Sequence, residues 1–238
     1  MRKLRSTINA LLVLCFAASL PLSARAETIT TEVEVYEINE PADAADTGGT
    51  TERFVANAFS DPVPSHKPLA SFGPFHMVTA DRAELIGSIE TETPAQFSAL
   101  LKSFPGLKQI DMVECPGTGD DEANLALARM VRRAGVTTYV PNGGSVRSGG
   151  VELFLAGAHR KADIGAEFAV HSWRDEDGME AEDFAANDPV HLAYLAYYRE
   201  MGMTDAKARA FYAMTNSAPN DDALYLKSND IAAYLPLS

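Results

Sequence analysis

Strands that alternate with helices run from about Phe75 to the C-terminus, and this alternation constrains the fold more than any other feature. Short runs of alternating or β-branched apolar residues predict strands, among them residues 109–115 and 136–140. Amphipathic stretches between them predict helices, such as the one that begins at Asp120 or Asp121. Parallel strands need long crossover connections, usually helices. The sequence therefore predicts an α/β fold with a mainly parallel sheet.

Local signals predict where individual elements begin and end. Thr93-Pro94-Ala95-Gln96 combines a capping threonine, a proline in the first turn and a glutamine, which together open a helix. Gly135 is expected to end the helix that begins at Asp120 or Asp121. Thr204 and Ser228 are expected to cap two later helices. The other expected elements are strands over 75–78, 83–89, most of 162–173 and 224–226, and helices over 149–158 and 188–201.

The first 26 residues have the layout of a secretory signal peptide. A basic start precedes the apolar run from Ile8 to Leu22, and Ala24-Arg25-Ala26 fits a cleavage site before Glu27. Residues 28–38 read as a strand, and residues 41–51 have the composition of a linker. We therefore expect a periplasmic or secreted protein with no stable membrane insertion after cleavage. Its expected organisation is a signal peptide over 1–26, an N-terminal extension and linker over 27–74, and an α/β domain over 75–238.

Charge and cysteine content narrow the class of protein further. The chain has 20 Lys+Arg against 33 Asp+Glu, a net charge of -13. The signal segment holds four basic and no acidic residues, so the mature chain has 16 − 33 = −17. Nucleic acid needs a basic surface and is excluded as a partner. Cys15 leaves with the signal, so Cys115 has no disulfide partner and is expected to pack in the core.

Two glycine-rich loops each lie between a predicted strand and a predicted helix. One is Cys115-Pro116-Gly117-Thr118-Gly119, and the other spans residues 143–150. Such loops present backbone N–H groups at a helix N-terminus, which suits a phosphate or an oxyanion. Neither loop has the lysine and glycine spacing of a Walker A loop or a dinucleotide fingerprint. Each loop alone is also compatible with a plain tight turn.

Residue types suited to nucleophilic catalysis follow these loops. Ser148 precedes an apolar helix, where a serine is most often an N-cap but is also a candidate nucleophile. His171 ends the strand Phe168-Ala169-Val170-His171, and histidine is the usual base for a serine. Asp221 and Asp222 come just before the strand expected at 224–226. A carboxylate there is placed either to orient His171 or to lie in a solvated turn.

Taken together and in order, these motifs resemble the ClpP/crotonase superfamily, on its ClpP-like serine peptidase side. Such families carry a strand ending in Ser-Pro-Gly-Gly, a Gly-x-Ala-Ala-Ser segment before an apolar helix, and a later strand ending in Ile-His. The corresponding segments here are Glu114-Cys115-Pro116-Gly117-Thr118-Gly119, Gly144-Ser145-Val146-Arg147-Ser148 and Phe168-Ala169-Val170-His171. The resemblance covers the chain from about Phe75 onward and is closest to exported, poorly characterised ClpP-like periplasmic proteins.

The resemblance implies a ββα superhelix and a role for each matching residue. Ser148 would be the nucleophile and His171 the general base, oriented by Asp222 or Asp221. The oxyanion hole would lie in the loop that contains Gly117, formed by the backbone N–H groups of Thr118 and Gly149. The implied substrate is a peptide or protein, and no cofactor or metal is implied. By analogy, the chain is expected to form a homo-oligomer, a trimer or a hexamer.

Two departures from the family pattern leave the function open. Thr118 stands where the family has a second glycine, and a side chain disfavours positive φ. Arg147 places a cation beside Ser148, where it either binds an acidic group or points to solvent. We therefore keep three hypotheses: an exported serine peptidase that works through an acyl-enzyme, a catalytically inactive binding or scaffold protein, and a thioesterase or esterase with the same nucleophile.

Overall fold

A computed structural model of the chain describes residues 67–238. The expected signal peptide, the strand over 28–38 and the linker over 41–51 all lie outside these residues. The sheet begins at β1 (Ala70–Phe72), before the boundary expected at Phe75. No helix within residues 67–238 is long and apolar enough to cross a membrane.

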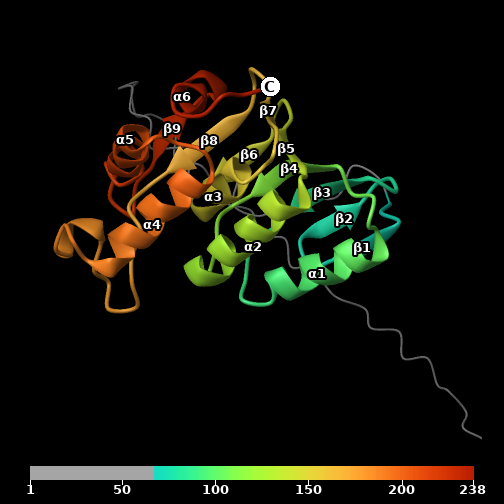
Figure 1. Cartoon of the computed structure of the whole chain (residues 1–238), viewed down its shortest axis with the longest axis horizontal. Coiled ribbons are helices and arrows are strands. Elements are labelled where there is room, and N and C mark those ends of the chain that lie inside the picture. Colours follow the sequence, from blue (N-terminus) through green and yellow to red (C-terminus); the bar gives the residue numbers. More distant parts are fainter. Residues whose placement is uncertain (1–66) are drawn as a thin grey trace, which may run out of the picture. The chain divides into compact units, whose positions relative to one another are not determined.

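A nine-stranded sheet runs through the described part of the chain (Figure 1). Its main path has the order β1-β2-β3-β4-β6-β8-β9, so β1 and β9 lie at opposite ends. The strands after β1 are β2 (Phe75–Met77), β3 (Arg82–Ile86), β4 (Gln109–Cys115), β5 (Thr137–Val140), β6 (Ser145–Arg147), β7 (Arg160–Ala162), β8 (Glu167–Val170) and β9 (Leu224–Leu226).

The sheet divides at β4. The first residues of β4 pair with β5, whereas its last residues, Glu114 and Cys115, pair with β6. All the pairs in this central region are parallel, namely β3 with β4, β4 with β5 and β6, β5 with β7, and β6 with β8. The pairs at the two ends are antiparallel. The prediction of an α/β fold with a mainly parallel sheet is therefore confirmed.

Helices connect these strands and cover the sheet (Figure 1). α3 lies in the interior, since all seven of its residues are buried, and it packs against α2 and β6. The helices are α1 (Thr93–Ser103), α2 (Asp121–Ala134), α3 (Gly149–Leu155), α4 (Pro189–Glu200), α5 (Asp205–Thr215) and α6 (Ser228–Ala232).

Most helix ends lie where the sequence places them. Asp120 is the N-cap of α2 and its carboxylate accepts a hydrogen bond from the Ala123 N–H, at 2.9 Å. Gly135 ends α2 in the left-handed region, with φ of 69°. The Thr204 side chain caps α5 as predicted.

Two predicted caps are wrong by one residue. Thr93 is the first residue of α1, and its hydroxyl accepts a hydrogen bond from the Glu90 N–H instead of capping the helix. Ser228 is likewise the first residue of α6, after the N-cap Lys227. The strand predicted over most of 162–173 is shorter in the structure, where it is β8, because β7 ends at Ala162 and a turn from Asp163 to Ala166 follows.

Cys115 lies in the core, as predicted. Its side chain is fully buried at the end of β4, and burial raises the pKa of its thiol to about 12. A side chain on Gly150 would place its Cβ 2.6 Å from the Cys115 sulfur. The thiol therefore fills space between β4 and α3, and Gly150 allows the close approach.

Candidate active site

The sheet register brings the predicted site residues to one edge. Cys115 at the end of β4 pairs with Val146 in β6, and Arg147 at the end of β6 pairs with Ala169 in β8. The loops that follow β4, β6 and β8 therefore emerge side by side at the carboxyl ends of parallel strands. Ligand sites of open α/β sheets lie in this position.

Ser148 has a strained backbone. Its φ is 49° and its ψ is -132°, and no other non-glycine residue of the described chain has positive φ. Hydrogen bonds hold this conformation, because the Ser148 N–H donates to the Ala169 carbonyl at 2.8 Å and its carbonyl accepts from the Val151 N–H at 2.9 Å. The residue precedes α3, but its hydroxyl makes no capping hydrogen bond. Ser148 therefore occupies the predicted N-cap position of α3 but does not cap the helix with its side chain, and strain of this kind gathers at functional sites.

A cavity of about 40 Å³ lies beside this turn, and Ser148 and His171 both line it. The volume has room for a few water molecules. Between these two described residues there is no direct hydrogen bond. Catalytic hydrogen bonds in ligand-free enzymes are often long and shorten only when the substrate binds. The structure thus brings together the predicted nucleophile and the predicted base.

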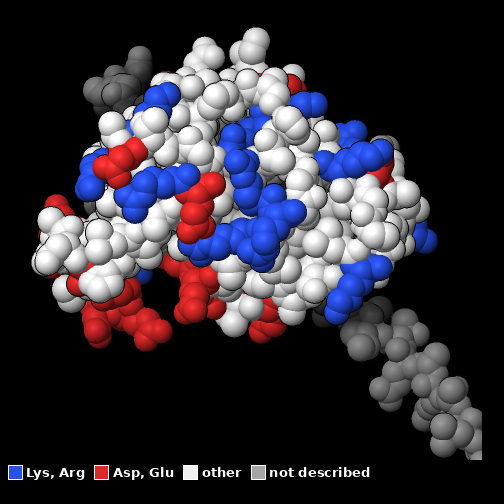
Figure 2. Space-filling model, in the orientation of Figure 1, with Lys and Arg blue, Asp and Glu red and all other residues white. Residues whose placement is uncertain are grey.

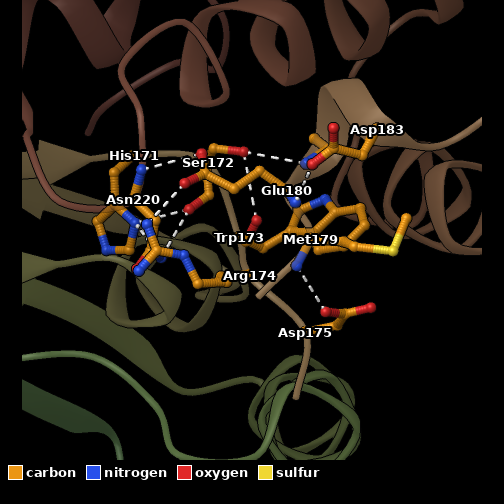
Figure 3. A network of polar contacts seen from close by, with 10 residues as sticks. His171, Ser172, Trp173, Arg174, Asp175, Met179, Glu180, Asp183 and Asn220 are labelled. Carbon is orange, nitrogen blue, oxygen red and sulfur yellow. Dashed lines mark hydrogen bonds and ion pairs between the residues drawn. The ribbon is translucent and has the colours of Figure 1, made fainter. Parts of the chain in front are cut away.

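The polar contacts of His171 engage one of its two ring nitrogens, Nδ1 (Figure 3). Its Nδ1 lies 2.8 Å from the Ser172 carbonyl oxygen and 3.1 Å from the Asn220 amide nitrogen, Nδ2. Asn220 Nδ2 also donates to the Ser172 carbonyl, at 2.9 Å. When Nδ1 carries the proton, it donates to the Ser172 carbonyl and leaves a lone pair on Nε2. In this tautomer the Asn220 amide nitrogen is a neighbour of Nδ1 and not its hydrogen-bond partner, since both nitrogens are donors. That tautomer is the one a general base needs.

Asn220, rather than Asp221 or Asp222, is therefore the side chain next to His171, which corrects the sequence-based prediction. Both aspartates are exposed, and Asp222 accepts a hydrogen bond from the Ala223 N–H at 2.7 Å. The antiparallel pairing of Val170 with Leu224 and the hydrogen bond from the Ser172 N–H to the Ala218 carbonyl set this register. As a result, Asn220, which precedes the two aspartates, lies next to His171.

A network of polar contacts holds Asn220 in place (Figure 3). The Glu180 carboxylate accepts from the Asn220 backbone N–H at 3.0 Å and from the Arg174 guanidinium at 2.7 Å. Arg174 is the main reason that the pKa of Glu180 lies below its usual value. Asp175 accepts from the Met179 N–H at 2.8 Å and so closes the turn between them. The segment after β8 is thereby tied to the loop that carries Asn220.

The predicted oxyanion loop lies directly against Ser148. Gly117 has φ of 136°, and a Cβ on it would lie 3.0 Å from the Ser148 Cβ, so only glycine fits there. A Cβ on Gly149 would lie 2.4 Å from the Thr118 methyl group, which shows that these two residues abut. Thr118 itself does not have positive φ, and its hydroxyl lies within hydrogen-bond distance of the Ile89 and Asp120 carbonyl oxygens, at 3.0 and 2.8 Å. The threonine is thus compatible with the loop, while the oxyanion role stays a prediction.

Arg147 neither points freely to solvent nor faces the cavity. Its guanidinium forms an ion pair with Glu114 on the neighbouring strand β4 and donates to the Ser145 hydroxyl at 2.7 Å. The cation beside the nucleophile is therefore neutralised within the sheet.

Two carboxyl groups that sequence reasoning missed also line the cavity. Glu152 lies one turn after Ser148 in α3 and is 6% exposed, and burial raises its pKa to about 7. Asp121, the first residue of α2, keeps contact with solvent, and partial desolvation raises its pKa as well. An electrostatic interaction with His171 opposes that rise. The helical spacing of four residues from Ser148 is the signal that would have identified Glu152.

Asn220→Ala is expected to lower the kcat for hydrolysis by about 10²-fold, because the alanine no longer holds the Ser172 carbonyl that orients His171. Asn220 does not line the cavity, so KM should change little. Steady-state kinetics check this prediction, with Asp221→Asn and Asp222→Asn as matched controls that stay within about twofold of the parent. A larger loss in either aspartate variant than in Asn220→Ala would contradict it.

In fold, about two thirds of the chain is similar to solved structures of ClpP1 and of a stomatin-specific protease. ClpP1 from Listeria monocytogenes, in a variant form, is 18% identical with a TM-score of 0.47 over 66% of this chain and 89% of that chain. The membrane-bound stomatin-specific protease 1510-N in complex with a substrate peptide is 16% identical with a TM-score of 0.44, over 66% and 72%. The 1510-N membrane protease specific for a stomatin homolog from Pyrococcus horikoshii is 14% identical with a TM-score of 0.41, over 65% and 69%.

No protein-family model matches the sequence, and no curated protein matches it either. The likenesses above concern the course of the backbone. The roles predicted for Ser148 and His171 therefore rest on the sequence motifs and on the geometry of this chain, and that of Asn220 on the geometry alone.

Proposed function

We propose that this chain is an exported serine hydrolase that cleaves peptide bonds through an acyl-enzyme on Ser148. The observation that carries the proposal is the state of this serine. Its backbone is strained, its hydroxyl caps no helix, and it lines the same cavity as His171. A strained strand-to-helix turn that exposes a serine is a known way to present a nucleophile.

The proposed reaction follows from these positions. Ser148 Oγ attacks the scissile carbonyl carbon while His171 Nε2 takes the hydroxyl proton. The C–N bond then breaks, the amine leaves with the proton from His171, and the acyl group stays on Ser148 as an ester. Water, deprotonated by His171, cleaves that ester, releases the acid and restores the serine. The proton on Nδ1 stays with the Ser172 carbonyl throughout.

The negatively charged oxygen of the tetrahedral intermediate has to be stabilised by hydrogen-bond donors. The proposed donors are the backbone N–H groups of Thr118 and Gly149, two residues that lie against each other. Gly149 is the first residue of α3, so its N–H has no acceptor within the helix. Each such donor is worth about 3 kcal/mol of transition-state stabilisation.

Labelling with a fluorophosphonate tests the proposal. The mature protein should react at one site, identified as Ser148 by mass spectrometry, because the reagent modifies only an activated serine. Ser148→Ala should remove the label, and His171→Ala should slow labelling by about 10²-fold or more. A folded protein that stays unlabelled would contradict the proposal and favour a binding or scaffold role. Labelled protein that cleaves esters but no peptide would favour the esterase alternative.

Export is proposed on the sequence of residues 1–26. N-terminal sequencing of protein expressed from the full chain in a bacterium tests it. The expected mature N-terminus is Glu27, recovered from the periplasm or the medium. A start at Met1 in the cytoplasm would contradict export without affecting the proposed chemistry.

A further inference from the structure

We infer that the cavity beside Ser148 binds a lysine or arginine side chain, so that the chain cleaves after basic residues. This inference rests on the proposed function and adds a substrate class to it. It follows from three groups that line the cavity and accept hydrogen bonds, two of them carboxyl groups. No lysine or arginine within residues 67–238 forms an ion pair with either carboxyl group.

Glu152 is the first of these groups. It projects from α3 one turn after Ser148, and its Oε1 accepts a hydrogen bond from the Tyr198 hydroxyl at 2.6 Å. None of the ion pairs within residues 67–238 includes Glu152. A carboxylate that is buried without a cation is costly in a protein interior. A cationic side chain of the substrate would supply the missing charge at the place where the substrate must bind.

Two further groups face the same cavity. Asp121 lines it from α2, and its charge adds slightly to the rise in the pKa of Glu152 that burial causes. Asn216 lines it from the end of α5 and directs its Nδ2 to the Tyr212 carbonyl at 2.8 Å. Its Oδ1 is buried and has no hydrogen-bond partner. A flipped amide would place the oxygen against that carbonyl, so the free group is an acceptor.

The walls of the cavity suit the stem of a basic side chain. They consist of Trp173, Tyr194, Tyr198 and Tyr212. Aromatic faces pack against methylene groups and attract cations. An aliphatic residue would also contact these walls, but it would bring no positive charge to Glu152 or Asp121 and no hydrogen-bond donor to the Asn216 oxygen. The combination therefore favours a long side chain that ends in a cation.

The surface cleft next to the cavity is lined mainly by acidic side chains. A cleft that continues from Asp121 is lined by Asp120, Asp175 and Glu176, together with Thr118 of the proposed oxyanion loop. Its one cation, Arg174, is paired with Glu180. Figure 2 shows acidic side chains gathered at the lower left of this face, near the start of α2 and the loop before α4. A basic peptide would be attracted along this path to Ser148.

Hydrolysis of matched substrates tests the inference. Two peptide esters that differ only in the acyl residue, lysine in one and norleucine in the other, have side chains of similar length with and without charge. We expect kcat/KM to be at least tenfold higher for lysine. Glu152→Gln and Asp121→Asn should each reduce this ratio at least threefold, mainly through KM. Glu122→Gln, an exposed neighbour on α2 outside the cavity, should leave the ratio unchanged.

Binding separates failure of this inference from failure of the proposed function. Ser148→Ala should bind a fluorescent peptide that contains lysine at least tenfold more tightly than its norleucine counterpart, measured by anisotropy. This result would support the cation site even if no substrate were turned over. Equal or weaker binding of the lysine peptide would overturn the inference, as would faster norleucine hydrolysis by a protein that fluorophosphonate labels at Ser148.

Discussion

Ser148→Ala is expected to lower kcat/KM for peptide hydrolysis by at least about 10⁴-fold while leaving the melting temperature within about 2 °C of the parent. The activity falls because no other group at the turn can form the acyl-enzyme. The stability holds because alanine keeps the Cβ atom and the strained backbone, and because the lost hydroxyl donates no hydrogen bond to the described chain. Steady-state kinetics and thermal unfolding on the same preparations measure the two quantities.

Two companion variants make this result specific. His171→Ala removes the base and should lower turnover by about 10²-fold or more with the serine still present. Ser103→Ala, at the exposed end of α1, is the matched control and should match the parent in both measurements. Turnover that survived in Ser148→Ala would assign the chemistry to another residue. A melting temperature lowered by 10 °C would mean that the hydroxyl has a structural role.

The order of strands and helices was predictable because each has its own periodicity. β4 and α2 match the predicted segments closely, since their apolar residues recur at the spacing of a strand and of a helix. β6 was read as part of a glycine-rich loop. It has only three residues, and its pairing with β4 and β8 defines it rather than any pattern of its own.

The meeting of Ser148 and His171 at one cavity was predictable because each stands at a boundary that the sequence marks, a glycine loop and a strand end. The residue that contacts the His171 ring was not, because its position depends on how β8 pairs with β9. A pairing set between distant segments brings Asn220 rather than Asp221 or Asp222 to His171. Glu152 was overlooked because α3 was read as an apolar core helix. That Glu152 lies beside the candidate site can be recognised only once the cavity lined by Ser148 and Glu152 is known.

Glu152→Gln is expected to raise the stability of the protein at pH 8 by about 3 kcal/mol, with little change at pH 5. Burial raises the pKa of Glu152 from 4.5 to about 7, so the folded chain binds this proton more tightly than the unfolded chain. The free energy of unfolding therefore falls as pH rises between these two values. The shift of about 2.5 pKa units corresponds to about 3 kcal/mol. Glutamine is neutral at both pH values and still accepts the Tyr198 hydrogen bond.

Thermal unfolding at pH 5 and pH 8 measures this effect, and for a chain of this size it corresponds to roughly 6–12 °C at pH 8. The exposed Glu122→Gln variant is the control and should show no difference between the two pH values. An equal change for Glu152→Gln at both pH values, or a loss of stability at pH 8, would contradict the prediction. A stabilised variant that also loses its preference for lysine would show that Glu152 lowers the stability of the fold and serves substrate binding. Residues at binding sites often trade stability for function in this way.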